Sequence, residues 1–188
     1  ARIPVLHTVK GNQHFRTTEQ SFLHIPEKPQ QKTIVRYDGR KVWKGFAKPT
    51  VPCDKLFQDD AIGESVGSGE GSVDIHLKVA PGASRHVVLG FCEGKWKEAG
   101  KRIMWVEIEG AEKKRIDPAG DFGYNTPGIH IARATDVNDD GKLLIAVTAI
   151  PGSADRNAIL NGLWVFNGNV PPGDSIILGK ANDEAHIY

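Results

Sequence analysis

An aromatic side chain and a carboxylate lie close together in a loop-like part of the sequence. Trp96 stands between Lys95 and Lys97, outside any alternating pattern, and Glu93 precedes it by three residues. The C–H patches of a sugar ring stack on an aromatic face, while its hydroxyls need carboxylate or amide partners. Trp96 and Glu93 are therefore candidate residues for a ligand that presents both C–H patches and hydroxyls. The alternative is that Trp96 packs as a lid over the end of a β-sandwich.

Two other segments carry side chains with the same chemistry. Phe122 and Tyr124 lie among the turn residues of 117–128, where they could form an opposite wall of the site or plug the mouth of the core. Asp155 could accept two hydroxyl hydrogen bonds, as a carboxylate does well. Alternatively, residues 153–157 form only a solvated turn. These residues extend the candidate site to three loops.

Metal binding and catalysis are weaker hypotheses. Asp136, Asn138 and Asp140 match the first half of a calcium loop, but Val147 stands where the bidentate Glu belongs, which favours a hairpin turn. His76 and His86, facing each other across a hairpin, would lack a third zinc ligand. We therefore expect no cofactor, with structural calcium as the alternative. Four carboxylates near the aromatic loops could supply an acid and base pair of a small hydrolase or lyase: Glu93, Glu98, Asp117 and Asp121.

Composition limits the class of protein. The 188 residues carry 24 Lys plus Arg against 23 Asp plus Glu, and a net charge of +1 gives no basic surface for nucleic acid or an anionic membrane. No run approaches the eighteen or so apolar residues of a membrane-spanning helix. The chain opens without a signal-type run, as a mature protein or a piece of a longer one would. With 21 Gly and 11 Pro, many turns and few long helices are expected.

The second half of the sequence predicts strands. Val73, Ile75 and Leu77 alternate with polar residues, the period of a half-exposed strand, and Pro81-Gly82 predicts a turn into an antiparallel partner at 86–91. Strands at 102–109, 113–116, 129–134, 143–150 and 159–166 would complete an all-β sandwich. The strand patterns also predict that three tryptophans pack in the core: Trp43, Trp105 and Trp164.

The first half is less regular. Residues 1–32 are predicted to be an irregular N-terminal segment or linker, 33–178 the sandwich domain, with a hairpin at 33–43, and 179–188 a polar tail. Cys53 and Cys92 are either bridged or free, and the apolar strand around Cys92 favours a buried thiol there.

Over about residues 72–166 the sequence resembles malectin and malectin-like carbohydrate-binding domains. The resemblance implies a jelly-roll-like sandwich of two antiparallel sheets that binds glycans. Trp96 then matches the second aromatic of the family's binding loop, Asp155 lies one residue out of register with its loop aspartate, and Asn157 matches its Asn-Pro, with Ala158 replacing Pro. The segments that carry the resemblance are 91–93, 102–110, 116–117, 140–147 and 157–166.

These observations lead to a functional expectation. The chain is predicted to be a non-catalytic carbohydrate-binding module, an accessory domain of a larger polysaccharide-active enzyme that is secreted or on the surface or in the periplasm of a bacterium. Its partners would be a neutral oligo- or polysaccharide and the neighbouring domains of that enzyme. The alternative is a purely structural sandwich of a multidomain glycoside hydrolase.

Overall fold

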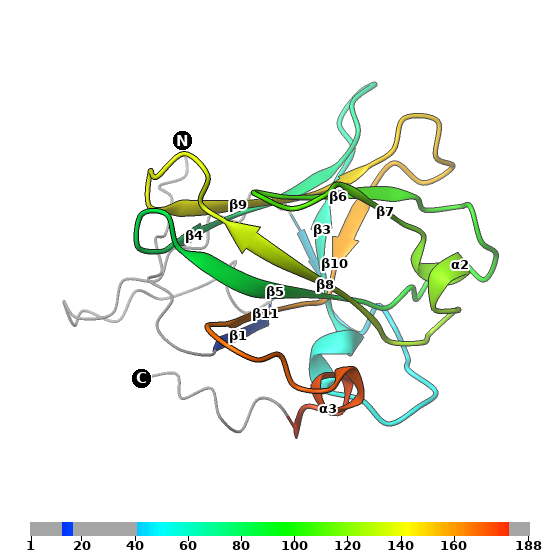
Figure 1. Ribbon diagram of the computed structural model, residues 1–188. Helices are drawn as coiled ribbons and strands as arrows, with labels where there is room; N and C mark the ends of the chain where they lie inside the picture. Colours follow the sequence, from blue (N-terminus) through cyan, green and yellow to red (C-terminus); the bar gives the residue numbers. More distant parts are fainter. Residues whose placement is uncertain (1–12, 17–40, 181–188) are drawn as a thin grey trace, which may run out of the picture.

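The computed structural model in Figure 1 describes residues 13–16 and 41–180, and strands dominate this part of the chain. The strands are β1 (Gln13–Arg16), β2 (Lys41–Trp43), β3 (Asp60–Gly63), β4 (Ser72–Lys78), β5 (Ser84–Phe91), β6 (Met104–Ile108), β7 (Lys114–Ile116), β8 (Gly128–Thr135), β9 (Lys142–Ala149), β10 (Ala158–Leu160) and β11 (Gly162–Phe166). Short helices interrupt them at η1 (Lys55–Gln58), α2 (Pro118–Asp121) and α3 (Gly173–Ile177).

Two four-stranded antiparallel sheets form a sandwich, which confirms the predicted fold class. Sheet I has the order β1-β11-β5-β8 and sheet II the order β4-β9-β6-β7; a short third sheet, sheet III, has the order β10-β3-β2. The period-two pattern of β4 points Val73, Ile75 and Leu77 into the core between sheets I and II. β1 belongs to sheet I, so four residues of the predicted N-terminal segment or linker are part of the sandwich.

The predicted pairing of β4 with β5 is wrong. β4 pairs with β9, with Val73 opposite Val147, whereas β5 lies in sheet I between β11 and β8. The turn at Pro81-Gly82 therefore carries the chain from one sheet to the other, as the loop at the left of Figure 1 shows. An alternating strand followed by a short turn fits a hairpin and a crossover equally well. His76 and His86 consequently lie in different sheets and do not face each other.

The predicted strand at 159–166 is divided at Asn161. β10 joins β3 in sheet III, whereas β11 joins β5 in sheet I. Asn161 is fully buried; its Oδ1 accepts the N–H of Cys92 at 2.7 Å, and its Nδ2 donates to the carbonyl of Asp59 at 3.0 Å. The side chain thus satisfies backbone groups that a continuous strand would have paired with another strand.

A second hydrophobic cluster covers the outer face of sheet I beneath η1 and α3. Trp164 and Phe57 are fully buried there, with ring centroids 5.9 Å apart, which confirms the core position predicted for Trp164. Cys92 is buried in this cluster and Cys53 packs against it, and both thiols are free. Burial raises the pKa of the Cys92 thiol, so the group is neutral and inert.

The prediction for Trp105 is wrong. Its strand neighbours Met104 and Val106 are buried, so Trp105 points out of sheet II and remains partly exposed, with the Lys113 ammonium 4.7 Å from its ring centroid. Trp43 packs on the core beside Phe46, with ring centroids 5.3 Å apart, as predicted. The strand 33–37 of the predicted hairpin lies outside the described residues, as do residues 181–188 of the tail.

The segment 117–128, in which the sequence predicted only turns, contains the short helix α2. Asp117 caps α2 by accepting the Gly120 N–H, and a carboxylate at this position satisfies a donor that a short helix leaves unpaired. No helix among residues 41–180 is long and apolar enough to cross a membrane.

Candidate functional site

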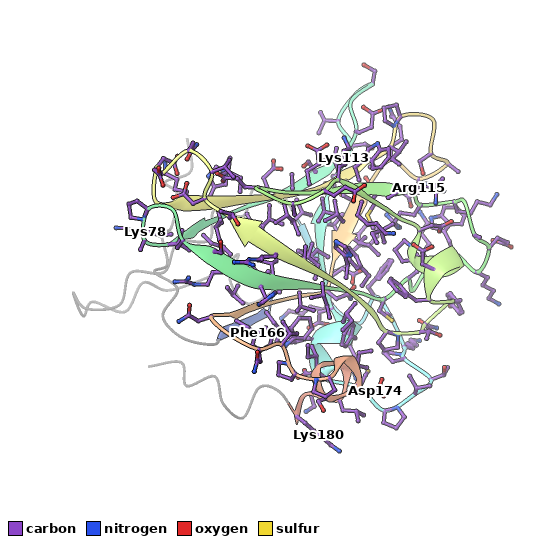
Figure 2. The ribbon with its side chains drawn as sticks, viewed as in Figure 1. Lys78, Lys113, Arg115, Phe166, Asp174 and Lys180 are labelled. Carbon is purple, nitrogen blue, oxygen red and sulfur yellow. The ribbon has the colours of Figure 1, made fainter. Side chains whose placement is uncertain are left out.

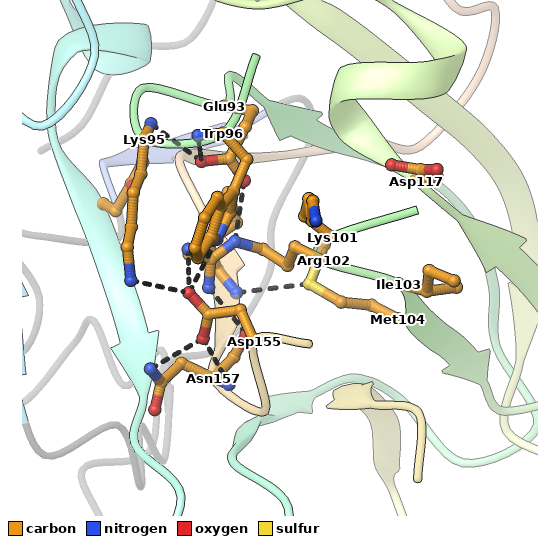
Figure 3. A network of polar contacts seen from close by, with 12 residues as sticks. Glu93, Lys95, Trp96, Lys101, Arg102, Ile103, Met104, Asp117, Asp155 and Asn157 are labelled. Carbon is orange, nitrogen blue, oxygen red and sulfur yellow. Dashed lines mark hydrogen bonds and ion pairs between the residues drawn. The ribbon is translucent and has the colours of Figure 1, made fainter. Parts of the chain in front are cut away.

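Three loops meet at one end of the sandwich: 92–103 after β5, 117–127 before β8 and 150–157 before β10. The first two are joined through backbone, since Glu93 and Tyr124 form an isolated parallel bridge and the Asn125 N–H donates to the Glu93 carbonyl at 2.8 Å. The fold therefore brings all three predicted binding segments together. At the base of the three loops lies a network of buried charged side chains, shown in Figure 3.

Glu93 is fully buried and its carboxylate is occupied by donors of the protein. Oε2 accepts a 2.7 Å hydrogen bond from Arg102 Nε, and Oε1 accepts the backbone N–H groups of Lys95 at 2.8 Å and Trp96 at 3.1 Å. A direct contact with sugar hydroxyls, predicted from the sequence, does not fit this geometry. Glu93 instead fixes the backbone that carries Trp96.

Asp155 is the second anion of the network. Its Oδ2 accepts from Arg102 Nη2 at 2.9 Å, Trp96 Nε1 at 2.9 Å and Lys95 Nζ at 3.1 Å. Burial raises the pKa of Asp155, but the Arg102 guanidinium and the other donors outweigh burial and hold that pKa below its ordinary value. Asp155 is thus ionised, and like Glu93 it holds Trp96 in position, so it does not reach outward to hydroxyls.

Asn157 closes the network. Its backbone N–H and its Nδ2 donate to Asp155 Oδ1 at 3.0 and 2.8 Å, its Oδ1 accepts the Ser65 N–H at 2.9 Å, and its carbonyl accepts from Arg102 Nη1 at 2.7 Å. Both the oxygen and the nitrogen of the Asn157 side-chain amide therefore bond to the protein, and this residue holds the 150–157 loop in its conformation.

Arg102 is the residue that sequence reasoning missed. Its side chain is 1% exposed, its guanidinium bonds to Glu93, Asp155 and Asn157, and it lies 5.9 Å from the Phe46 ring centroid. The alternation of the strand could have revealed it. Met104 and Val106 face the core, and Arg102, two residues before Met104, therefore lies on the same buried face. A buried cation requires an anionic partner, which the loops supply.

The aromatic residues divide into rim and core. Trp96 is half-buried, and its backbone N–H and its Nε1 are both held by carboxylates. Tyr124, 36% exposed, lies on the adjoining loop with the Lys97 ammonium 5.7 Å from its ring centroid. Phe122 packs on the core, so close to Gly128 that a Cβ there would come within 2.1 Å of its ring. Phe122 therefore closes the core and is not a wall of the site.

Asp136, Asn138 and Asp140, the residues of the calcium alternative, accept hydrogen bonds within a turn. The buried carboxylate of Asp136 accepts the N–H groups of Gly82, Asp140 and Gly141 at 3.1, 3.2 and 2.8 Å. Burial raises its pKa, but these backbone donors more than offset burial and lower that pKa. Asn138 and Asp140 likewise accept backbone N–H groups of the turn. Within the described ranges, no group of three or more His, Cys, Asp or Glu side chains could hold a metal ion.

One buried carboxyl group beside the network is only partly satisfied. Asp60, fully buried in β3, accepts a hydrogen bond from Asn161 Nδ2 at Oδ1, while its Oδ2 has no partner among the residues that the structure describes. Burial raises the pKa of Asp60 far above its ordinary value; the nearby Arg102 cation lowers it and the Glu93 anion raises it. Asp60 is therefore the group whose ionisation the fold opposes.

Asp60→Asn should stabilise the fold at neutral pH. An unfolded Asp releases its proton near pH 4, whereas folded Asp60 retains it to higher pH, so wild-type stability falls as pH rises between these two pKa values. The amide has no such dependence, and its advantage in Tm should widen from about pH 4 to pH 7. Thermal melts across this range measure the difference, with the exposed Glu98→Gln as control. A difference in Tm that does not change with pH would contradict the assignment.

Comparisons with known proteins bear on the fold. No protein-family model matches the sequence, and a search of curated proteins finds no match. Among solved structures, the ANXUR2 extracellular domain from Arabidopsis thaliana has a TM-score of 0.57 at 15% identity, covering 74% of this chain and 43% of that one. The Arabidopsis ANX1 ectodomain has a TM-score of 0.58 at 12% identity, covering 90% and 51%.

A third similar structure is an enzyme. A Bacteroides uniformis β-glucuronidase has a TM-score of 0.60 at 17% identity, covering 89% of this chain and 20% of that chain. The chain thus spans between about a fifth and a half of these structures. The likeness extends well beyond residues 72–166, on which the sequence resemblance rests. Because the ANXUR ectodomains are malectin-like domains, the conclusion from these comparisons is that the described sandwich has a malectin-like fold.

Proposed function

We propose that this chain is a non-catalytic carbohydrate-binding domain that binds a glycan through the rim aromatics Trp96 and Tyr124. The observation that carries the proposal is the fixing of Trp96. Carboxylates of Glu93 and Asp155 orient its backbone and its indole, while the side chain remains half-exposed on the rim. An aromatic anchor whose rotamer is already fixed loses little conformational entropy when a sugar stacks on it.

The buried network supports a binding role over a catalytic one. Of the four carboxylates that could supply an acid and base pair, Glu93 bonds to Arg102 and the loop backbone, while Asp117 accepts the N–H groups of Gly100 at 2.6 Å and Gly120 at 3.2 Å. Groups with these roles hold loops in place. Lys95 and Lys97 carry ammonium groups on the rim, and these can donate hydrogen bonds to sugar hydroxyls.

The setting of the domain is part of the proposal. The similarity to an extracellular domain and to part of a larger glucuronidase supports a secreted or surface-exposed bacterial protein, in which this chain is an accessory domain of a polysaccharide-active enzyme. A neutral glycan is the first ligand to test, because the net charge of +1 gives the whole chain little preference for acidic polymers.

One observation favours the alternative that the chain is a purely structural sandwich. Glu93, Asp155 and Asn157, which the sequence analysis predicted to be binding residues, are satisfied by protein partners, as they would be in a sandwich that only spaces catalytic domains. Under this alternative no glycan would bind, whereas the binding proposal requires one.

Trp96→Ala should weaken binding to a neutral oligosaccharide, chosen from a glycan array, by at least about tenfold, because aromatic anchors carry a large share of binding energy. Its Tm should fall less than that of a buried-Trp variant, since Asp155 keeps Arg102 and Lys95 as partners. Titration calorimetry and thermal melts measure the two effects. Trp96→Phe is the matched variant: it retains a stacking face, loses the Nε1 bond and should bind with intermediate affinity.

Two outcomes would count against the binding proposal. If the wild-type chain retains no neutral glycan, the structural-module alternative is favoured. If Trp96→Ala binds as tightly as wild type, the ligand lies elsewhere on the domain.

A further inference from the structure

The outer face of sheet II carries an aromatic residue that does not pack in the core. Trp105 points away from the buried Met104 and Val106, and the backbone register places Thr148 of β9 on one side of it and Arg115 of β7 on the other. Directly opposed residues of neighbouring strands share a face, with Cβ atoms about 5 Å apart. Figure 2 labels Lys113 and Arg115 in the upper part of the molecule, where Figure 1 places β7.

The row continues into polar side chains on the next strand. Ser72 of β4 lies opposite Thr148, and their hydroxyl oxygens are 2.9 Å apart; the Ser72 hydroxyl also donates to Asp74 Oδ1 at 2.8 Å. From β4 through β9 and β6 to β7, neighbouring strands thus present a row of four side chains: the Ser72 and Thr148 hydroxyls, the Trp105 indole and the Arg115 guanidinium. With strands ~4.8 Å apart, the row extends over ~14 Å, the scale of a short oligosaccharide.

The charged side chains of this face are not all paired with one another. Lys113 forms an ion pair with Glu107, and Asp74 accepts the Ser72 hydroxyl. Arg115 is exposed and has no acidic partner among residues 41–180. A guanidinium pairs with a planar carboxylate through two parallel hydrogen bonds, so the Arg115 end of the row favours an anion with this shape.

We propose that this row is a second saccharide-binding surface, which takes a chain of uronate sugars with one ring on Trp105 and its carboxylate on Arg115. The hydroxyls of Ser72 and Thr148 and the carboxylate of Asp74 then pair with hydroxyls of the next sugar. The Lys113 ammonium over the Trp105 ring belongs to an ion pair whose two side chains are 48% and 53% exposed. Such pairs are weak, so a sugar can displace this lysine.

The surface is separate from the rim. Trp105 lies on the outer face of sheet II, whereas Trp96 lies in the 92–103 loop and bonds to Asp155. The proposal does not rest on glycan binding at Trp96, and the two sites differ in expected ligand, neutral at the rim and acidic on the sheet.

The test uses the full chain with polygalacturonate and with its methyl ester, which has the same sugar rings without the charge. Affinity electrophoresis of wild type should show retardation by polygalacturonate and weaker retardation by the ester. Trp105→Ala should raise the Kd for polygalacturonate at least about tenfold. Arg115→Gln should raise it several-fold and remove the preference for the acid over the ester.

Two controls separate this surface from general charge and from the rim. Lys180→Gln removes the same charge from the opposite end of the molecule, at the bottom of Figure 2, and should bind polygalacturonate like wild type. Trp96→Ala should also leave this binding unchanged, while losing the neutral ligand of the rim. Thermal melts verify that each variant is folded; because Arg115 is exposed, its variant tests the site even if Trp105→Ala unfolds.

Three results would overturn the proposal. The first is a wild-type chain that polygalacturonate does not retard. The second is Arg115→Gln, or a folded Trp105→Ala, with wild-type affinity. The third is a Lys180→Gln variant weakened as much as Arg115→Gln, which would indicate binding by overall charge alone.

Discussion

Arg102→Met should lower the free energy of unfolding by roughly 3–5 kcal/mol, because breaking a buried ion pair leaves an uncompensated charge in the interior. Glu93 would lose its charged partner while it remains fully buried, and Asp155 would lose the guanidinium that lowers its pKa. Methionine has a similar length, so the cost reflects charge more than volume. Since most domains are stable by only about 5–15 kcal/mol, the variant should be marginally folded. Urea titration measures the loss.

The matched control for Arg102 is Lys95→Met. Lys95 also binds Asp155 Oδ2, at 3.1 Å, but its side chain is 45% exposed. Exposed pairs contribute about 0–1 kcal/mol, so the control should remain close to wild type. Adding Glu93→Gln to Arg102→Met should recover part of the loss, since the two effects are coupled through one bond. Equal costs for the Arg102 and Lys95 variants would show that the network does not behave as a buried ion pair.

The arginine variant also connects stability with the proposed function. Without Arg102, the 92–103 loop keeps its backbone hydrogen bonds to Glu93. The carboxylates of Glu93 and Asp155, which hold Trp96, would however lose the buried guanidinium that fixes both of them. We therefore expect Arg102→Met to weaken neutral glycan binding at temperatures where the variant is still folded. Calorimetry at low temperature measures this loss separately from unfolding.

Trp164→Ala should cost about 3–5 kcal/mol through the cavity that it leaves. The indole is fully buried between sheet I and the η1 and α3 helices, and Gly90 and Gly162, paired across β5 and β11, leave room for one edge of its ring. A Cβ at Gly90 would lie 2.8 Å from the ring and one at Gly162 would lie 2.7 Å from it. A site built this tightly around one side chain has no larger neighbour able to fill the space.

Trp105→Ala is the control for this effect. It removes the same side chain from the outer face of sheet II, where solvent replaces the lost contacts, so its loss in Tm should be well under that of Trp164→Ala. Thermal melts of the two variants compare them directly. Similar losses in Tm would mean that Trp105 supports the core more than its outward register indicates.

Sequence patterns predicted the faces of strands better than their neighbours. The alternation in 73–79, 104–108 and 143–149 correctly separates buried from exposed residues in β4, β6 and β9. The same register places Trp105 with Glu107 on the outer face, and the expectation of a core tryptophan failed because it followed the apolar character of the residue and neglected its register. The pairing of β4 with β5 failed for another reason: a strand that alternates can pair with any other strand of matching pattern.

By itself, the sequence determined the all-β class, the buried and exposed faces of the main strands, and the three loops that carry Trp96, Tyr124 and Asp155. Only the tertiary structure decided what these loops do. Arg102 is nine residues from Glu93 and 53 residues from Asp155 in the sequence. The three side chains meet because the end of β5 and the beginnings of β6 and β10 lie at the same end of the sandwich. Local periodicity records which side of a strand is buried. It contains no information about which residues distant in the sequence come into contact, because these contacts depend on which strands of the whole chain pair with one another.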